Sequence, residues 1–157
     1  MKKQAFLDRD QLLAHWQGHR NLTRKTIEKF PESEFFTFSI GGMRPFSELI
    51  KELITIAVPG LEGIVNKTEE PFDHNIKVES KEEFLKLWDE QTPRITELYN
   101  QIKDEEFQEI TNLFGQYKDI NYNNILYFID NEIHHRAQAF VYLRALGIEP
   151  PFFWERD

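Results

Sequence analysis

The chain has 157 residues, a formal net charge of −8 at pH 7 and no cysteine. Its 40% hydrophobic and 14% aromatic content excludes a disordered chain, and its length predicts a single domain over residues 1–157. The lack of cysteine excludes disulfides, thiolate metal ligands and a cysteine nucleophile, while the scattered basic residues argue against a nucleic-acid partner.

The first third of the sequence predicts two helices. Apolar residues recur at helical spacing over residues 8–29, and Pro31 ends this pattern. After a glycine pair, Pro45 suits the first position of a second helix because its missing N–H needs no partner there. Residues 46–57 give this helix one apolar stripe, which Pro59 weakens.

The middle of the chain predicts one helix followed by a less regular stretch. Ser80 and Glu83 match a capping box, so a third helix is expected to begin there, with a kink at Pro93. Residues 103–121 show no clean period and are interpreted as a loop with a short helix.

The longest helical pattern covers residues 121–146 and ends at Gly147, a predicted left-handed cap. It has two nearly opposite stripes without formal charge when His135 is neutral, which predicts burial on both sides. One stripe is expected to meet the bundle core, and the other a partner subunit or a lined cavity. The first stripe contains Tyr122, Leu126, Ile129, Ile133, Ala137 and Phe140, and the second contains Asn124, Phe128, Asn131, His135, Gln138 and Tyr142.

The densest set of ligand-type side chains also lies on this last helix. Asn131 and His135 are four residues apart and share a face, with Gln138 beside them. His135 is the strongest candidate metal ligand, and a hydrogen-bonded core network is the alternative interpretation. Glu132 and Arg136 are spaced for a salt bridge and are expected at the surface or an interface.

Further candidates lie on other segments. Glu52 falls at the edge of the second helix's apolar stripe, where a carboxylate needs water, a partner or a cation. His15 and His19 form a second pair four residues apart, with His19 nearer the inward stripe. His74 is expected in a loop. The sequence contains no glycine-rich phosphate loop and no nucleophile elbow.

Residues 131–151 resemble the last-helix motif of the DinB/YfiT-like family. Residues 20–23 and 43–49 resemble the same family on the first and second helices, so the similarity covers nearly the whole chain. The resemblance implies an all-α fold, a DinB-like four-helix bundle of the up-down-down-up type with irregular connections. It also implies a homodimer.

Members of this family commonly hold a divalent metal through one histidine on the second helix and two on the last. These positions fall on Glu52, Asn131 and His135, so the resemblance implies an altered metal site, with His19 as an additional ligand. Replacing two imidazoles by a carboxylate and an amide lowers affinity for nickel or zinc and shifts preference toward harder cations such as manganese.

Characterised relatives imply a metal-dependent transferase, using a low-molecular-weight thiol, or a hydrolase acting on a small molecule. The alternative is a non-catalytic stress- or damage-induced binding protein with a degenerate metal site. The start of the chain at residues 1–3 lacks the pattern of a signal peptide, and no run reaches the roughly 18 apolar residues of a membrane span. The expected location is the cytoplasm.

Overall fold

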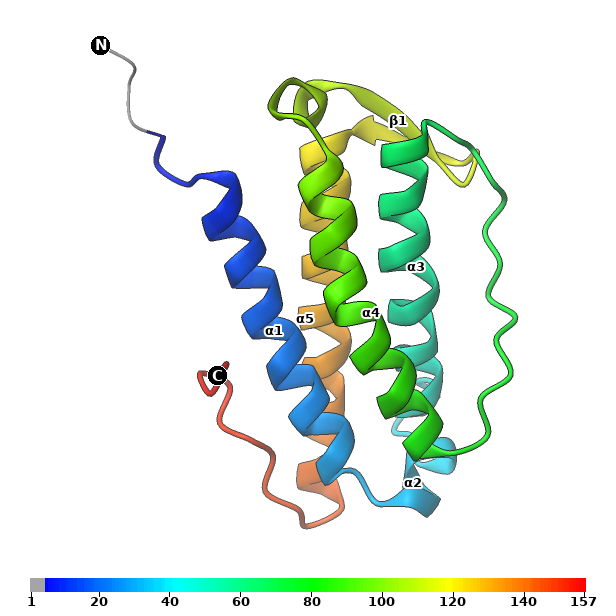
Figure 1. The fold of residues 1–157 in the computed structure, drawn as a ribbon. Helices are drawn as coiled ribbons and strands as arrows, with labels where there is room; N and C mark the ends of the chain where they lie inside the picture. The colour runs from blue at the N-terminus through cyan, green and yellow to red at the C-terminus, as the bar shows by residue number, and fades with distance from the viewer. Residues whose placement is uncertain (1–4) are drawn as a thin grey trace.

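A computed structural model describes residues 5–157, so the expectation for residues 1–3 lies outside the described residues. Four long helices form the bundle (Figure 1): α1 (Arg9–Lys29), α3 (Phe46–Asn66), α4 (Lys81–Gln101) and α5 (Asn121–Ala145). α1 and α5 run in one direction and α3 and α4 in the other, which is the up-down-down-up arrangement. Because α1 and α3 each pack on both α4 and α5, the predicted all-α bundle is confirmed.

The sequence signals for helix ends agree with the observed caps. Asp8 accepts a hydrogen bond from the Gln11 backbone N–H and completes a capping box before α1. Ser80 and Glu83 form the predicted capping box before α4. Gly147, with φ of 76°, adopts the left-handed conformation expected after α5.

The first helix ends at Lys29 as predicted, but the structure differs from the sequence prediction after this helix and at Pro59. A short helix, α2 (Glu32–Thr37), follows α1 where the sequence predicted only a stop. α3 continues through Pro59 to Asn66, because the apolar residues after the proline, among them Leu61 and Ile64, are buried in the core. This burial offsets the backbone hydrogen bond that proline cannot make.

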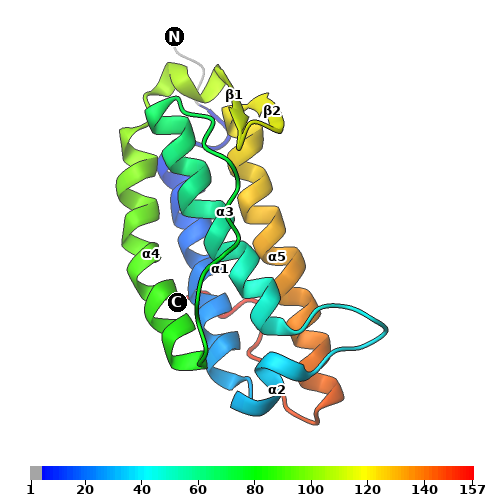
Figure 2. The same ribbon diagram turned by 90° about the vertical axis from the view of Figure 1, so that its right-hand side faces the viewer.

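Residues 103–121 contain a β-hairpin that the sequence analysis missed. A 3₁₀ helix, η1 (Asp104–Gln108), precedes strands β1 (Ile110–Leu113) and β2 (Tyr117–Ile120), which pair antiparallel with Leu113 opposite Tyr117. Each strand has only four residues and most of them are polar or exposed, so neither shows a clear alternating pattern. The hairpin lies across one end of the bundle, and residues 67–80 run along the outside of α3 from that end to the start of α4 (Figure 2).

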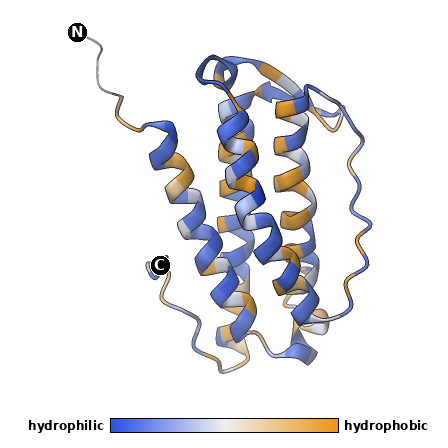
Figure 3. Cartoon of the chain, viewed as in Figure 1, coloured by the Kyte–Doolittle hydropathy of each residue, from blue (hydrophilic) through white to orange (hydrophobic). Residues whose placement is uncertain are grey.

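The core consists of two apolar clusters, one at each end of the bundle. Trp16 and Phe128 belong to the cluster at the hairpin end, and Phe46 and Trp88 belong to the cluster at the other end. The helices accordingly show hydrophilic and hydrophobic stretches side by side (Figure 3). α3 and α5 approach closely at Gly60, where an added Cβ would lie 2.4 Å from the Phe128 ring. Glycine at this position therefore sets the spacing between these two helices.

The two neutral stripes of α5 have different environments in the single chain. The stripe that contains Phe128, His135 and Tyr142 is buried apart from the half-buried Gln138. In the opposite stripe Tyr122 and Leu126 are 39% and 37% exposed. The prediction that both stripes are buried is therefore correct for the His135 stripe and wrong for the opposite stripe in the single chain. None of the helices described is long and apolar enough to cross a membrane.

Candidate functional site

Glu52 from α3 and His135 from α5 face each other between these two helices. The Nε2 atom of His135 lies 3.0 Å from Oε1 of Glu52, a hydrogen-bond distance. Their side chains are 7% and 18% exposed, so the pair lies just below the surface. Two residues far apart in the sequence thus form one polar site, as the family resemblance implied.

Arg44 binds the second oxygen of the same carboxylate. Its Nη1 atom lies 2.6 Å from Oε2 of Glu52. The hydrogen bond to His135 and then the Arg44 guanidinium lower the pKa of Glu52 to about 2, against the opposing effect of burial. Glu52 is therefore ionised at neutral pH and lies between two donors.

The turn between α2 and α3 holds the other side of the site. Nδ1 of His135 lies 3.0 Å from Oε1 of Gln138, and Nε2 of Gln138 donates to the sulfur of Met43 at 3.7 Å. The Tyr142 hydroxyl donates to the backbone carbonyl of Arg44 at 2.9 Å. These contacts fix Arg44 and the His135 ring relative to α5.

Asn131 lies one turn before His135 on the same face of α5. It is 9% exposed, and its Nδ2 atom is buried without a hydrogen-bond partner among the described residues. A buried donor without a partner normally costs free energy, so Nδ2 of Asn131 could donate to an acceptor atom of a ligand. Hereafter "the groove" is used only as a name for the α3–α5 face that contains Glu52, Asn131 and His135.

His19, the fourth predicted ligand, makes its contacts on a different side of α5. Its Nδ1 atom accepts from Nη2 of Arg136 at 2.9 Å, and its Nε2 atom lies 3.1 Å from Nε2 of His15. Burial first, and then Arg136, Arg156 and His15, lower the pKa of His19 to about 3. The structure therefore does not bring His19 together with the groove residues.

Glu132 and Arg136 were expected at a surface and instead are buried, 2% and 5% exposed. Glu132 accepts hydrogen bonds from Thr23 Oγ1 at 2.6 Å and from Trp16 Nε1 at 3.3 Å. Arg136 donates to Thr23 Oγ1 at 3.1 Å and to the His19 carbonyl at 3.0 Å. No direct salt bridge joins the two; both bind α1, because α5 packs against α1 as well as α3.

His74 lies in the segment between α3 and α4, as predicted, but it contacts α3. Its Nδ1 atom lies 3.0 Å from Thr55 Oγ1, and its Nε2 atom lies 3.9 Å from Glu48 Oε2. Within residues 5–157, no three histidine, aspartate or glutamate side chains are grouped closely enough to hold a metal ion on their own. A cation in the groove would therefore need the Asn131 amide or solvent in addition to Glu52 and His135.

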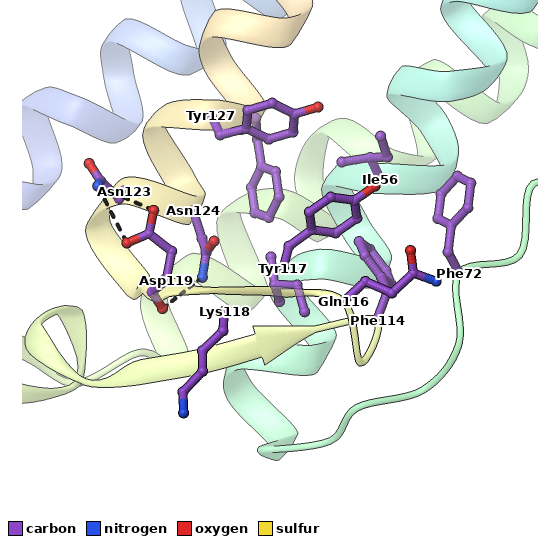
Figure 4. Close-up of a pocket in the computed structure, with 12 residues that line it drawn as sticks. Ile56, Phe72, Phe114, Gln116, Tyr117, Lys118, Asp119, Asn123, Asn124 and Tyr127 are labelled. Atoms are coloured by element: carbon purple, nitrogen blue, oxygen red, sulfur yellow. Dashed lines mark hydrogen bonds between the residues drawn. The ribbon is translucent and has the colours of Figure 1, made fainter.

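A pocket of about 470 Å³ opens at the hairpin end of the α3–α5 face (Figure 4). Ile56, one turn after Glu52, and Tyr127, one turn before Asn131, belong to its wall. Because Ile56 and Tyr127 lie one helical turn from Glu52 and Asn131, the pocket and the groove are neighbours. Burial, followed by the charge of Glu52, raises the pKa of Tyr127. The sequence analysis missed this pocket because several lining residues come from the unpredicted hairpin. The other lining residues are Phe72, Leu113, Phe114, Gln116, Tyr117, Lys118, Asp119, Asn123, Asn124 and Phe128.

A bundle of four long helices, with the Glu52–His135 pair between α3 and α5, defines the class of protein. The family model described as "DinB family" matches residues 1–156, and the chain belongs to this family. The resemblance stated from the sequence is therefore confirmed.

Solved structures of DinB-like proteins share the fold. A DinB-like protein from Bacillus subtilis is 23% identical, with a TM-score of 0.75, over 93% of this chain and 98% of that one. A DinB-like protein from Bacillus cereus is 16% identical, with a TM-score of 0.74, over 91% of this chain and 95% of that one. A search of curated proteins found no match.

Proposed function

We propose that this protein is a small-molecule enzyme that uses a divalent metal ion held in the groove by Glu52 and His135, with Asn131 as a third ligand. The supporting observation is the pairing of an ionised carboxylate with an imidazole at 3.0 Å. Asn131 would bind the ion through its amide oxygen, whereas its unpartnered Nδ2 is a hydrogen-bond donor. Carboxylate, imidazole and amide oxygen are all known metal ligands.

The spacing of the donor atoms fits this role. Glu52 Oε1 and His135 Nε2 are separated by 3.0 Å, so only a small movement of the two side chains would be needed for both to reach one ion. The mixed oxygen and nitrogen set suits manganese, nickel or zinc. Arg44 opposes the binding of a metal ion, because its positively charged guanidinium forms an ion pair with the other oxygen of Glu52.

A metal ion bound there would act as a Lewis acid and lower the pKa of a coordinated water or thiol. This chemistry supports a transferase that uses a low-molecular-weight thiol, or a hydrolase. The groove residues would do the remaining work: Gln138 orients the His135 ring through Nδ1, and Arg44 keeps Glu52 ionised. With its acidic charge and its lack of cysteine, the protein would work in the cytoplasm without nucleic acid.

One observation favours a second candidate, a non-catalytic stress-response protein with a degenerate metal site. Arg44, Glu52 and His135 already form a continuous chain of ion pairs and hydrogen bonds. These contacts satisfy the Glu52 carboxylate without a metal ion. The competing role of Arg44 therefore separates the two candidates.

Calorimetric titration with manganese, nickel and zinc chlorides tests the proposal. We expect the wild type to bind one ion per chain, His135→Ala to weaken binding at least 100-fold, and Arg44→Met to tighten it several-fold because the competing charge is removed. His74→Ala is the matched control, since it replaces a histidine outside the groove, and should bind like the wild type. Absence of stoichiometric binding in both the wild type and Arg44→Met would refute the metal site and favour the second candidate.

The expected homodimer also remains a proposal. The exposed α5 residues Leu126 and Val141 and the C-terminal Phe153 and Trp154 supply apolar surface that a second copy could cover. A stable 18.8 kDa monomer in sedimentation equilibrium at micromolar concentration would contradict it.

A further inference from the structure

The pocket at the hairpin end of the α3–α5 face has aromatic walls. Phe72, Phe114, Tyr117 and Tyr127 line its sides, and the buried Phe128 belongs to the core behind it. Small-molecule sites are mostly apolar clefts of about 300–1,000 Å³ with a few polar groups. At about 470 Å³ the pocket has room for a bicyclic organic group.

The charged residues at its rim offer no cation to a ligand inside the pocket. The Asp119 carboxylate accepts from the backbone N–H of Ile120 at 2.7 Å and from Nδ2 of Asn123 at 3.3 and 3.4 Å. The Lys118 side chain points away from the other lining residues (Figure 4). An anionic ligand would therefore find no cation in the pocket and would approach the carboxylates of Asp119 and Glu52.

One lining residue, Phe114 in the hairpin turn, has a strained backbone conformation. Phe114 has a φ of 57°, in the left-handed region that residues other than glycine rarely adopt. Its ring packs edge-to-face on Phe72, with ring centroids 5.3 Å apart. This strained conformation directs an aromatic ring to the pocket wall, where a glycine would fit the backbone without strain.

We propose that this pocket binds an uncharged aromatic part of the small molecule on which the groove acts. Ile56 lies four residues after Glu52 on α3, and Tyr127 lies four residues before Asn131 on α5. Four helical residues span about 6 Å, so one ligand can fill the pocket and reach Glu52 and His135. The assignment of this ligand as a substrate rests on the proposed function, whereas aromatic binding by the pocket does not.

Two matched fluorescent probes test the pocket. N-phenyl-1-naphthylamine is neutral, and 8-anilinonaphthalene-1-sulfonate has the same ring system with one negative charge. We expect one neutral probe to bind per chain, at least tenfold more tightly than the sulfonate. Equal or tighter binding of the sulfonate would overturn the proposal.

Variants locate the bound probe. Phe114→Gly removes the ring and relieves the backbone strain, so it should weaken binding of the neutral probe at least fivefold. Tyr117→Ser, at an exposed strand position, should weaken binding without disturbing the core. Trp154→Ala is the control, because Trp154 lines a separate aromatic surface at the C-terminus. Unchanged binding in both pocket variants, or loss of binding in Trp154→Ala, would show that the probe binds elsewhere.

Probe binding and metal binding by the wild type are measured in separate titrations, and together they separate this proposal from the metal site. If the wild type binds metal but not the probe, the pocket proposal fails and the metal site stands. If the wild type binds the probe but not the metal, the metal site fails and the pocket proposal stands.

Discussion

Polar residues on the two sides of α5 differ in how fully they are hydrogen-bonded. On the α1 side, Glu132 and Arg136 are buried and bind Thr23 from two directions. On the α3 side, Asn131 and His135 are also buried, but the Asn131 amide nitrogen has no partner among the described residues. One helix thus contains both an internal hydrogen-bond network and a site with unused hydrogen-bonding capacity.

This difference distinguishes stability from function. Charged groups taken out of water need partners inside the protein, and those partners leave little capacity for a ligand. Glu132 illustrates the structural case: its Oε1 atom accepts from Thr23 Oγ1 and its Oε2 atom accepts from Trp16 Nε1. We therefore expect substitutions on the α1 side to change stability, and substitutions on the α3 side to change binding.

The largest expected effect is that of Glu132→Ala. Removing one member of a buried charged network leaves the others uncompensated and typically costs about 3–5 kcal/mol. Arg20 and Arg136 are the charges that Glu132 faces. Urea denaturation at pH 7 measures the loss, with Glu132→Gln, which keeps the shape, expected to lose about half as much. A loss below about 1 kcal/mol for the alanine variant would remove the distinction between the two sides.

The second prediction concerns acid and His19. Because the pKa of folded His19 is lowered to about 3 from 6.5, the unfolded chain binds more protons between these values. Stability is therefore full above pH 6.5 and falls as the pH decreases toward 3, by at most about 1.4 kcal/mol per pH unit. Between pH 6.5 and 5 the wild type should lose up to about 2 kcal/mol through this residue. His19→Gln should show a flatter dependence in urea denaturation, and His134→Gln, at an exposed position, should not.

The elements set by local sequence could be predicted, and the environments set by neighbouring helices could not. The capping box at Ser80 and the glycine after α5 depend on adjacent residues, so they were correctly predicted. Helical spacing put Glu132 and Arg136 on one face, but it could not show that α1 covers that face.

The candidate site shows the same limit. Spacing linked Asn131 to His135, whereas only the family resemblance connected them to Glu52, 83 residues from His135 in the sequence. Helical spacing also directed His19 inward correctly, but not toward a particular neighbour. The hairpin and its pocket were missed because four-residue strands give too short a pattern for alternation to be recognised.

The smallest expected effect on stability is that of Glu52→Gln in the groove. Glu52 is partly exposed and its partner Arg44 is about half exposed, so solvent screens their attraction. The glutamine side chain can still accept from His135, which limits the loss of unfolding free energy to about 1 kcal/mol or less at pH 7. In the same variant, metal binding should weaken at least tenfold in calorimetric titration, because the only charged ligand is gone. A loss of stability as large as that of Glu132→Ala, with metal binding unchanged, would mean that the Glu52–His135 pair is also a structural contact and that the difference between the two sides of α5 does not mark a functional site.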